Sequence, residues 1–428
     1  MSLPRSLAIT LIAAWWTFGC TRPSLATPTA SAPAVPSATA SATAAVIETP
    51  TAEMPGPPTP VPATPAPASL AIAHLSPGAH LVVSWIQMAD AATGWATGGR
   101  GDVADHVART ADGGVTWSDV TPPEEAPAPD APKTALGFTL DGLHAWVVFS
   151  PLGGYPTPLA PVVWRTTDGG STWLPSVPLA TEGLSEMFAP DRFFFLDETH
   201  GWLMVALGAG MSHEYIALFR TVDGGLTWER LLDPYGIYIQ SFSKTGMAFA
   251  DADYGWVTRD SHGVQPGFIL DITEDGGLTW EERTFQPPEA APAFFDEWAC
   301  GVHSPTFFGP QSGLFGLTCL SYQDFKTSKS YIYRTNDRGK TWAIVPSPDG
   351  DLRFLNPNEG WAFGPTIDWT EDGGLTWEAV KQVSWVGQFS FVDRQRGWAV
   401  ARSDTAIALV STTNGGTSWQ EFHPVIGP

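Results

Sequence analysis

One phrase of nine residues occurs seven times in this chain, and it limits the possible folds more than any other feature. Its first copy runs from Arg109 to Trp117 and reads RTADGGVTW. The anchor residues of the seven copies recur at steps of 35 to 62 residues and are Asp112, Asp168, Asp223, Asp275, Asp337, Asp372 and Asn414. Repeats at such steps are typical of supersecondary units that stack and bury their faces against one another.

A second phrase lies upstream of each copy of the first. It is a Gly-Trp pair or a close variant, with Asp or a similar turn-forming residue five positions before the aromatic one. The pairs are Gly94-Trp95, Ala145-Trp146, Gly201-Trp202, Gly255-Trp256, Gly313-Leu314, Gly360-Trp361 and Gly397-Trp398. The upstream residues are Asp90, Asp141, Asp197, Asp251, Gly309, Asn356 and Asp393. Both phrases keep the same order seven times, which is very unlikely to arise by chance.

The last repeat shows what each unit contains. Its residues 388–392, 398–401, 406–411 and 419–422 read as four strands, separated by turns rich in Asp, Asn and Gly. Each repeat therefore predicts a four-stranded antiparallel sheet, with almost no signal for helix. Seven such sheets predict an all-β fold: a single seven-bladed β-propeller over residues 70–428.

The Asp phrase carries the chemistry of a hairpin. Asp accepts hydrogen bonds from nearby backbone N–H groups, and the Gly pair provides positive φ angles. The Trp offers a large apolar face to bury between blades. Seven metal or catalytic sites are the alternative, but the phrase has no spare ligand. We therefore expect structural Asp residues and no cofactor, metal or catalytic residue.

The N-terminal residues predict export. Residues 1–20 combine Arg5 with an apolar run and read as a lipoprotein-type signal peptide, in which Cys20 would carry the lipid. An unlipidated, secreted form is the alternative. Residues 21–69 are dominated by Ala, Thr, Pro and Ser and read as a disordered tether. The propeller would then be anchored to the membrane and face the periplasm or the cell exterior.

Cysteine use and charge narrow the environment further. Cys300 and Cys319 both fall in the fifth repeat, where a disulfide is expected in an exported protein and two free thiols are the alternative. The net charge of −22 argues against a nucleic-acid partner, which requires a basic surface. It also argues against a protein that lies flat on an anionic membrane.

Strand direction places the long insertions on one face. In a four-stranded meander the two short turns share one end, so residues 122–133, 151–161, 207–215, 258–267, 283–304 and 321–329 emerge at the other. Variable loops on a rigid scaffold usually carry binding residues. The candidate binding residues there are Tyr155, His213, Tyr215, Trp298 and Tyr322. Asp296 and Glu297 are adjacent, so their side chains would point apart in an extended segment. Residues 69–75 could add an outer strand to the last blade.

The Asp phrase is the Asp-box, or bacterial neuraminidase repeat. Together with the upstream Asp-x-x-x-Gly-Trp phrase and the Arg-Thr before the box, it resembles the photosystem II stability/assembly factor family over about residues 81–423. This resemblance implies a seven-bladed propeller and a non-enzymatic assembly factor at the lumenal or periplasmic side of photosynthetic membranes. Asp-boxes also occur in sialidases, xyloglucan-cleaving glucanases and sortilin-type receptors, so the box is specific for the fold and not for function.

Three functions remain open from the sequence. The first is a membrane-tethered, monomeric scaffold that binds a protein or membrane-protein complex on the insertion face. The second is a carbohydrate-active or sugar-binding propeller, such as a sialidase or another glycoside hydrolase. The sialidase form is disfavoured because the chain contains no Arg-Ile-Pro phrase. The third is a purely structural module of the cell surface.

Overall fold

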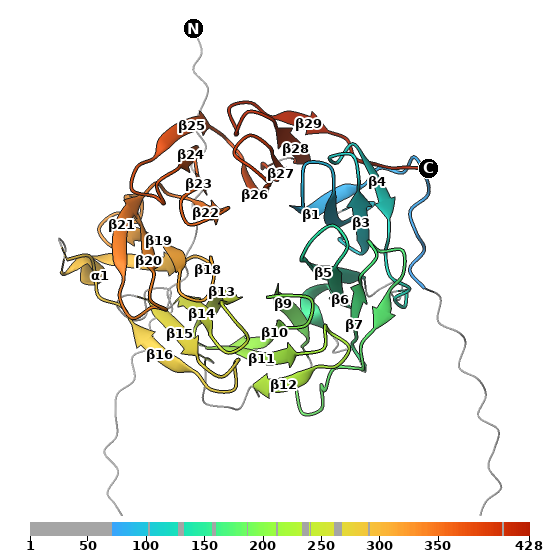
Figure 1. Cartoon of the computed structure of the whole chain (residues 1–428), viewed down its shortest axis with the longest axis horizontal. Helices are drawn as coiled ribbons and strands as arrows, with labels where there is room; N and C mark the ends of the chain where they lie inside the picture. The colour runs from blue at the N-terminus through green and yellow to red at the C-terminus, as the bar shows by residue number, and fades with distance from the viewer. Residues whose placement is uncertain are drawn as a thin grey trace, which may run out of the picture. The chain divides into compact units, whose positions relative to one another are not determined.

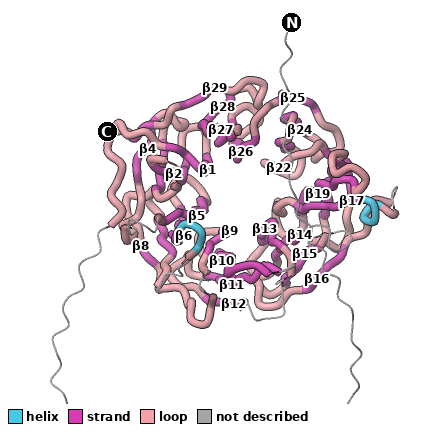
Figure 2. The backbone as a smooth tube through the Cα atoms, turned by 180° about the vertical axis from the view of Figure 1, so that it is seen from behind, coloured by secondary structure: helices cyan, strands magenta, loops and turns pink. Residues whose placement is uncertain are grey.

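A computed structural model describes residues 71–428 except 102, 127–131, 156–159, 186, 211–212, 233–238, 240, 261–267, 290–291 and 405. In the described part, seven antiparallel sheets stand radially around a central axis (Figures 1 and 2), so the predicted seven-bladed propeller is confirmed. The signal segment, Cys20 and the tether lie outside the described residues. Among the described residues, no helix combines the length and the apolar character needed to cross a membrane.

Each blade is a four-stranded meander, except that the C-terminal strand Val425–Ile426 adds to blade 1 and the first strand of blade 5 is divided in two. The first strands that Figure 1 labels lie nearest the axis. Blades 1 to 3 contain β1 (Val82–Met88), β2 (Gly94–Gly99), β3 (His106–Thr110), β4 (Thr116–Asp119); β5 (Lys133–Thr139), β6 (Ala145–Pro151), η1 (Leu152–Gly154), β7 (Val163–Thr166), β8 (Leu174–Pro175); and β9 (Ala189–Phe195), β10 (Gly201–Gly210), β11 (His213–Thr221), β12 (Glu229–Leu232).

Blade 5 departs from the simple meander, since a short helix precedes it and its first strand is divided into β17 and β18. Blades 4 to 7 contain β13 (Ser243–Phe249), β14 (Gly255–Asp260), β15 (Ile269–Thr273), β16 (Glu281–Thr284); α1 (Phe294–Glu297), β17 (Trp298–Val302), β18 (Thr306–Phe307), β19 (Gly313–Ser321), β20 (Ser328–Thr335), β21 (Ala343–Ser347); β22 (Asp351–Phe354), β23 (Gly360–Phe363), β24 (Thr366–Thr370), β25 (Glu378–Gln382); and β26 (Val386–Phe391), β27 (Gly397–Arg402), β28 (Ile407–Thr412), β29 (Gln420–Phe422). The chain ends with β30 (Val425–Ile426).

Each Asp-box forms a hairpin turn that its anchor side chain caps, a carboxylate in six boxes and the Asn414 amide in the seventh. The Asp112 carboxylate accepts hydrogen bonds from Thr110 Oγ1 (2.9 Å), Thr116 N (2.9 Å) and Thr116 Oγ1 (2.7 Å). Gly113 and Gly114 have φ angles of 77° and 91°, which a side chain would strain. The same hydrogen bonds recur in later repeats, for example around Asp223 and Asp372.

The upstream phrase forms the other short turn of each blade. The Asp90 carboxylate accepts hydrogen bonds from the backbone N–H groups of Ala92 and Thr93, both at 2.7 Å, as an Asx turn requires. Gly113 N of the Asp-box turn then donates to Ala92 O at 2.8 Å, and every blade has an equivalent hydrogen bond. The two short turns therefore lie at the same end, as predicted, and the insertions emerge at the other.

The Gly-Trp tryptophans join neighbouring blades. Trp146, Trp202 and Trp398 donate from Nε1 to the carbonyl oxygen that follows the Asp-box aspartate or asparagine of the next blade, at 2.8, 2.9 and 2.8 Å. Trp146 and Trp202 are at most 1% exposed. In the same interfaces, the arginine that precedes the box often donates to these turns as well, as Arg165 does to Asp223 O. The rings therefore contribute apolar burial and a specific hydrogen bond together.

The C-terminus closes the ring on the first blade. β30 pairs in parallel with β4, and Ile426 is buried beside Trp117. Gln388 of blade 7 bonds both backbone groups of Ile86 in blade 1, at 2.9 and 2.8 Å. The suggested outer strand at residues 69–75 is corrected, because Ala71 bridges Glu125 of the blade 1–2 connection and not the last blade. Figure 1 shows the C-terminal segment beside β4.

Replacing Asp372 with Ala should lower the melting temperature by a few degrees, because Thr370 and Thr376 lose their shared acceptor. Asp372→Asn should cost less, since Asn414 occupies this position in the seventh box. There its Oδ1 accepts from Ser418 N (2.9 Å) and its Nδ2 donates to Ser418 Oγ (2.8 Å). Thermal melts followed by circular dichroism measure both variants. Equal losses would contradict a role for the hydrogen-bonding geometry.

The same pair of proteins tests the pH dependence. The hydrogen bond from the Thr376 hydroxyl, helped by that from its backbone N–H, lowers the pKa of Asp372 to about 2. In the unfolded chain the pKa is about 3.9. The depressed pKa therefore stabilises the fold fully above about pH 4, and this contribution is lost as the pH falls toward 2. Melts between pH 2 and 7 should show a smaller acid loss for Asp372→Asn than for the unchanged protein.

Candidate functional site

The candidate residues predicted from the sequence come from blades 2, 3 and 5. Tyr155 follows η1 and is 58% exposed, and Tyr215 in β11 and Tyr322 after β19 are 39% and 36% exposed. Within this set of candidates, the His213 ring stacks on the Tyr215 ring of the same strand, with centroids 6.1 Å apart. These residues therefore mark separate points on the insertion face and do not converge on one centre.

Trp298 is not on the surface, which corrects its assignment to the binding face. It begins β17 and is buried, with its ring stacked on Phe294 of α1 at 5.3 Å between centroids. The Lys329 ammonium lies 4.6 Å from the centroid of the Trp298 ring. The sequence placed Trp298 in a loop because nothing in the pattern shows that α1 folds over the end of blade 5.

The tip of the β19–β20 hairpin exposes an aromatic pair. Phe325 is 62% exposed and lies edge-to-face against Tyr322, with 6.0 Å between ring centroids. Its φ angle is 50°, in the left-handed region that bulky residues rarely adopt. Phe325 N donates to Ser321 O at 2.8 Å, which holds this conformation. Phe325 is not among the binding residues predicted from the sequence, although an aromatic residue directly after a turn-forming Asp is a visible signal.

Polar groups and a disulfide make this hairpin rigid. The Asp324 carboxylate accepts from the backbone of Lys326 and Thr327, each at 2.9 Å, and from the Thr327 hydroxyl at 2.6 Å. The Thr327 hydroxyl bond is the main reason that the pKa of Asp324 falls to about 2. Close to the tip, a disulfide joins Cys319 of β19 to Cys300, its partner in the β17–β19 pairing.

A buried ionic network joins blades 3 and 4, and no sequence pattern predicts it. Arg259 and Asp271, both about 2% exposed, form a two-point pair, and Arg259 also reaches Glu282 Oε2 at 2.7 Å. Lys244 Nζ donates to the carbonyl oxygens of Glu214 and Phe242. Burial raises the pKa of Asp271 to about 6 against the opposing effect of Arg259.

The side chains of this network bind the segment that connects blade 3 to blade 4. Arg259 and Lys244 both contact Ser241, and Lys244 N donates to Glu214 Oε2 at 2.7 Å. Burial is also the main reason that the pKa of Lys244 falls to about 7. Phe242 in this connection has a φ angle of 59°. The buried cations therefore hold a strained backbone segment by its carbonyl groups.

One arrangement comes near to a nucleophile with a base. His303 Nε2 lies 2.9 Å from Thr318 Oγ1, and Asp351 Oδ1 lies 3.9 Å from His303 Nδ1. The second distance exceeds the hydrogen-bond reach that orients a catalytic base. The Thr318 hydroxyl also forms a hydrogen bond with the Ser330 hydroxyl, which donates to Asp349 Oδ1 at 2.6 Å. This chain of polar groups connects blades 5 and 6. Among the described residues, no group of three or more His, Cys, Asp or Glu is placed to hold a metal ion.

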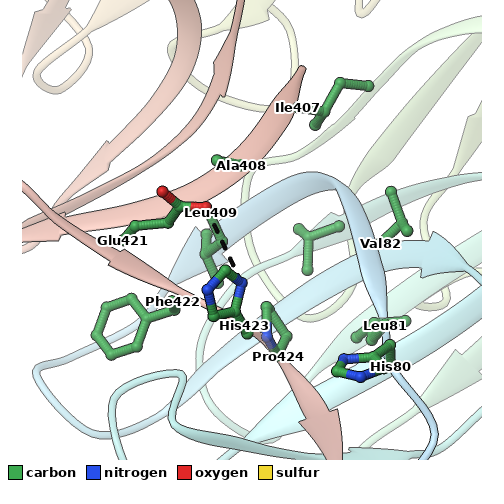
Figure 3. A pocket seen from close by; sticks show the side chains of 11 residues that line it. His80, Leu81, Val82, Ile407, Ala408, Leu409, Glu421, Phe422, His423 and Pro424 are labelled. Carbon is green, nitrogen blue, oxygen red and sulfur yellow. Dashed lines mark ion pairs between the residues drawn. The ribbon is translucent and has the colours of Figure 1, made fainter. Parts of the chain in front are cut away.

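In the described part of the chain, pockets occur at two of the interfaces between blades. The first, of about 160 Å³, lies at the closure seam between blades 1 and 7 (Figure 3). There His423 Nδ1 lies 3.9 Å from Glu421 Oε1, and His80 pairs with Val425. The second, of about 580 Å³, lies between β16 and the outer part of blade 5 and is lined by aromatic and basic side chains.

The chain matches no protein-family model and no curated protein sequence. Among solved structures it is similar to YCF48 bound to a D1 peptide, with 18% identity over 82% of this chain and 99% of that one and a TM-score of 0.47. It is also similar to a puromycin-hydrolyzing peptidase of Mycobacterium tuberculosis (14% identity, 83% and 56% of the two chains, TM-score 0.51) and to a PL25 ulvan lyase (11%, 81% and 95%, TM-score 0.47).

These likenesses concern the fold alone. The seven-bladed fold that the repeat phrases predicted is confirmed by the seven radial sheets themselves. The similar structures include a binding protein and several enzymes, and the shared fold does not choose between these functions.

Replacing Arg259 with Met should lower the free energy of unfolding by about 3–5 kcal/mol, because Asp271 then keeps a buried charge without its main partner. The double variant Arg259→Met/Asp271→Leu should recover part of this loss. Arg353→Met is the control: Arg353 pairs with Asp351 at an exposed site and should cost less than about 1 kcal/mol. Urea unfolding measures all three. A loss at Arg259 no larger than at Arg353 would refute the argument.

Proposed function

We propose that this protein is a non-enzymatic binding scaffold that presents the β19–β20 hairpin to a protein partner. The observation that carries the proposal is Phe325, a bulky residue with a positive φ angle whose ring is 62% exposed. A backbone conformation of this kind costs about 1–3 kcal/mol and persists only where surrounding structure enforces it. The ring contacts Tyr322 but leaves most of its surface exposed, so burial within the described chain offsets little of this cost, which favours a role in binding.

The shape of the site favours a protein over a small ligand. Small molecules bind mostly in concave pockets, whereas Phe325 and Tyr322 stand at the tip of a hairpin. A projecting aromatic residue held on a rigid support is typical of the residues that dominate protein interfaces. The disulfide Cys300–Cys319 and the Asp324 turn supply that support. The resemblance of the repeat phrases to assembly factors agrees with this function.

The proposal includes the cellular location expected from the sequence. Residues 1–20 would direct export, a lipid on Cys20 would anchor the protein, and residues 21–69 would separate the propeller from the membrane. The partner would then be a protein or membrane-protein complex on the periplasmic or extracellular side. The closed ring leaves the first and last blades paired with each other, which agrees with a monomer.

Placing a photo-crosslinking phenylalanine analogue at position 325 should link the protein to one partner, which mass spectrometry identifies. With that partner purified, the variant Tyr322→Ser/Phe325→Ser should bind at least tenfold more weakly in a titration. The control Val222→Ser/Leu375→Ser removes two similarly exposed apolar side chains near the Asp-box turns and should bind normally. Equal binding by both variants, or turnover of a glycan substrate by the unchanged protein, would overturn the proposal.

Replacing Cys20 with Ser should move the exported protein from the membrane fraction to the soluble fraction, because the thiol that would carry the lipid is absent. Labelling of cells with an alkyne fatty acid should mark the unchanged protein and not the variant. Ser24→Ala serves as the control in the same segment and should stay with the membrane. An unlabelled, soluble unchanged protein would favour the secreted form.

A further inference from the structure

We propose that the groove between blades 4 and 5 is a second binding site, which takes an extended acidic peptide that carries an aromatic side chain next to a carboxylate. Its lining comes from the end of β16, from β20 and β21, and from the Asp-box turn between β20 and β21. Figure 1 shows β16 and β21 in neighbouring blades. The groove has a volume of about 580 Å³, within the range of ligand-binding pockets. It is separate from the β19–β20 hairpin tip and does not depend on the function proposed for that tip.

The floor of the groove is aromatic. Phe285 lies edge-to-face on Trp342 and Tyr333, with centroids 5.1 and 5.6 Å apart. Tyr333 is fully buried, while Phe285 and Trp342 are half-buried and line the groove. Trp342 Nε1 already donates to Gly339 O at 3.0 Å, so the indole offers the ligand its apolar surface. Such a floor suits a flat apolar group, because aromatic rings pack well edge-to-face or offset.

The rim of the groove is basic. Arg283 and Lys340 are the charged residues that line it, and no carboxylate lines it. Arg283 donates to Gly339 O at 3.0 Å across the two blades, which leaves its guanidinium at the edge of the groove. Lys340 is exposed. Arg283 also lies 3.8 Å from the Glu281 carboxylate, so Lys340 is the main cation that the lining offers to an anionic ligand.

The turn that carries Lys340 departs from the repeat. The position of Lys340 holds Val, Ser, Leu or Thr in the other six boxes, and Arg338 stands where those boxes have Gly. Arg338 has a φ angle of 61°. Its guanidinium lies 4.3 Å from the centroid of the Tyr254 ring and 3.0 Å from Asp251 Oδ2, so blade 4 holds the turn in place. The basic rim therefore stands on a turn that is fixed from both blades.

The sheet edges beside the groove favour a peptide over a glycan. β16 pairs with β15 and β21 pairs with β20, and each is the outermost strand of its described sheet. The outer edge of such a strand offers unpaired backbone N–H and C=O groups, which recognise the backbone of an extended peptide. An aromatic side chain of that peptide would rest on Phe285 and Trp342, and a neighbouring carboxylate would meet Lys340.

The test is a titration of the full-length protein with a fluorescein-labelled peptide in which Glu and Phe alternate, followed by fluorescence anisotropy. Lys340→Leu restores the residue of three other boxes, so the turn should fold, and binding should weaken at least fivefold. The peptide with Gln in place of Glu should lose a similar factor. Leu375→Lys places a cation on the equivalent turn of blade 6 and should leave the affinity unchanged. The hairpin variant Tyr322→Ser/Phe325→Ser should also bind normally, which separates this site from the first.

Several results would overturn the proposal. One is equal affinity of the unchanged protein and Lys340→Leu, or no saturable binding of the peptide. Another is loss of binding in the hairpin variant, which would place the peptide at the β19–β20 tip. Lys340-dependent binding of an oligouronate, with none of the peptide, would assign the groove to an acidic glycan.

Discussion

At five of the seven blade interfaces in the described chain, the carbonyl group that follows the Asp-box aspartate accepts a hydrogen bond from the preceding blade. The carboxylate fixes the turn, and the turn aims this carbonyl at the preceding blade. There the indole of Trp146, Trp202 or Trp398 donates to it while the ring fills the space between sheets. A local hairpin motif thus becomes an interface between blades. The Asp residues stabilise the fold, because their carboxylate oxygens accept hydrogen bonds within the turn.

Blades 4 and 5 use different donors to the equivalent carbonyl group of the next blade. Trp256 Nε1 donates to Tyr254 OH at 3.0 Å, and Tyr254 OH donates in turn to Arg338 O, so a phenol is inserted between the indole and the carbonyl. Leu314 replaces the tryptophan in blade 5 and has no indole to donate; Arg334 provides the donor to Gly373 O instead. Two other interfaces differ further: Trp95 Nε1 donates to Asp141 O in the other short turn of blade 2, and the buried Nε1 of Trp361 has no hydrogen-bond partner among the described residues.

The departures from the repeat gather in blade 5 and at its interface with blade 4. The disulfide, α1, the left-handed Phe325 and the left-handed Arg338 all belong to blade 5. Both proposed binding sites use this blade, one at the hairpin tip and one in the groove between blades 4 and 5. A regular ring supplies rigidity, and the irregular blade supplies surfaces that differ chemically from the other six. The buried pair Arg259–Asp271 adds rigidity next to this region, in blade 4.

The sequence by itself determined the seven sheets, the two kinds of turn and the face on which the insertions emerge. Each of these follows from residues within a few positions of one another, such as Asp112 and Thr116 or Asp90 and Thr93. Only the tertiary structure decided the closure by β30 on β4, the burial of Trp298 under α1, the Arg259–Asp271 network and the groove between β16 and β21. These features join residues far apart in the chain, and no local pattern records which distant side chain will meet them.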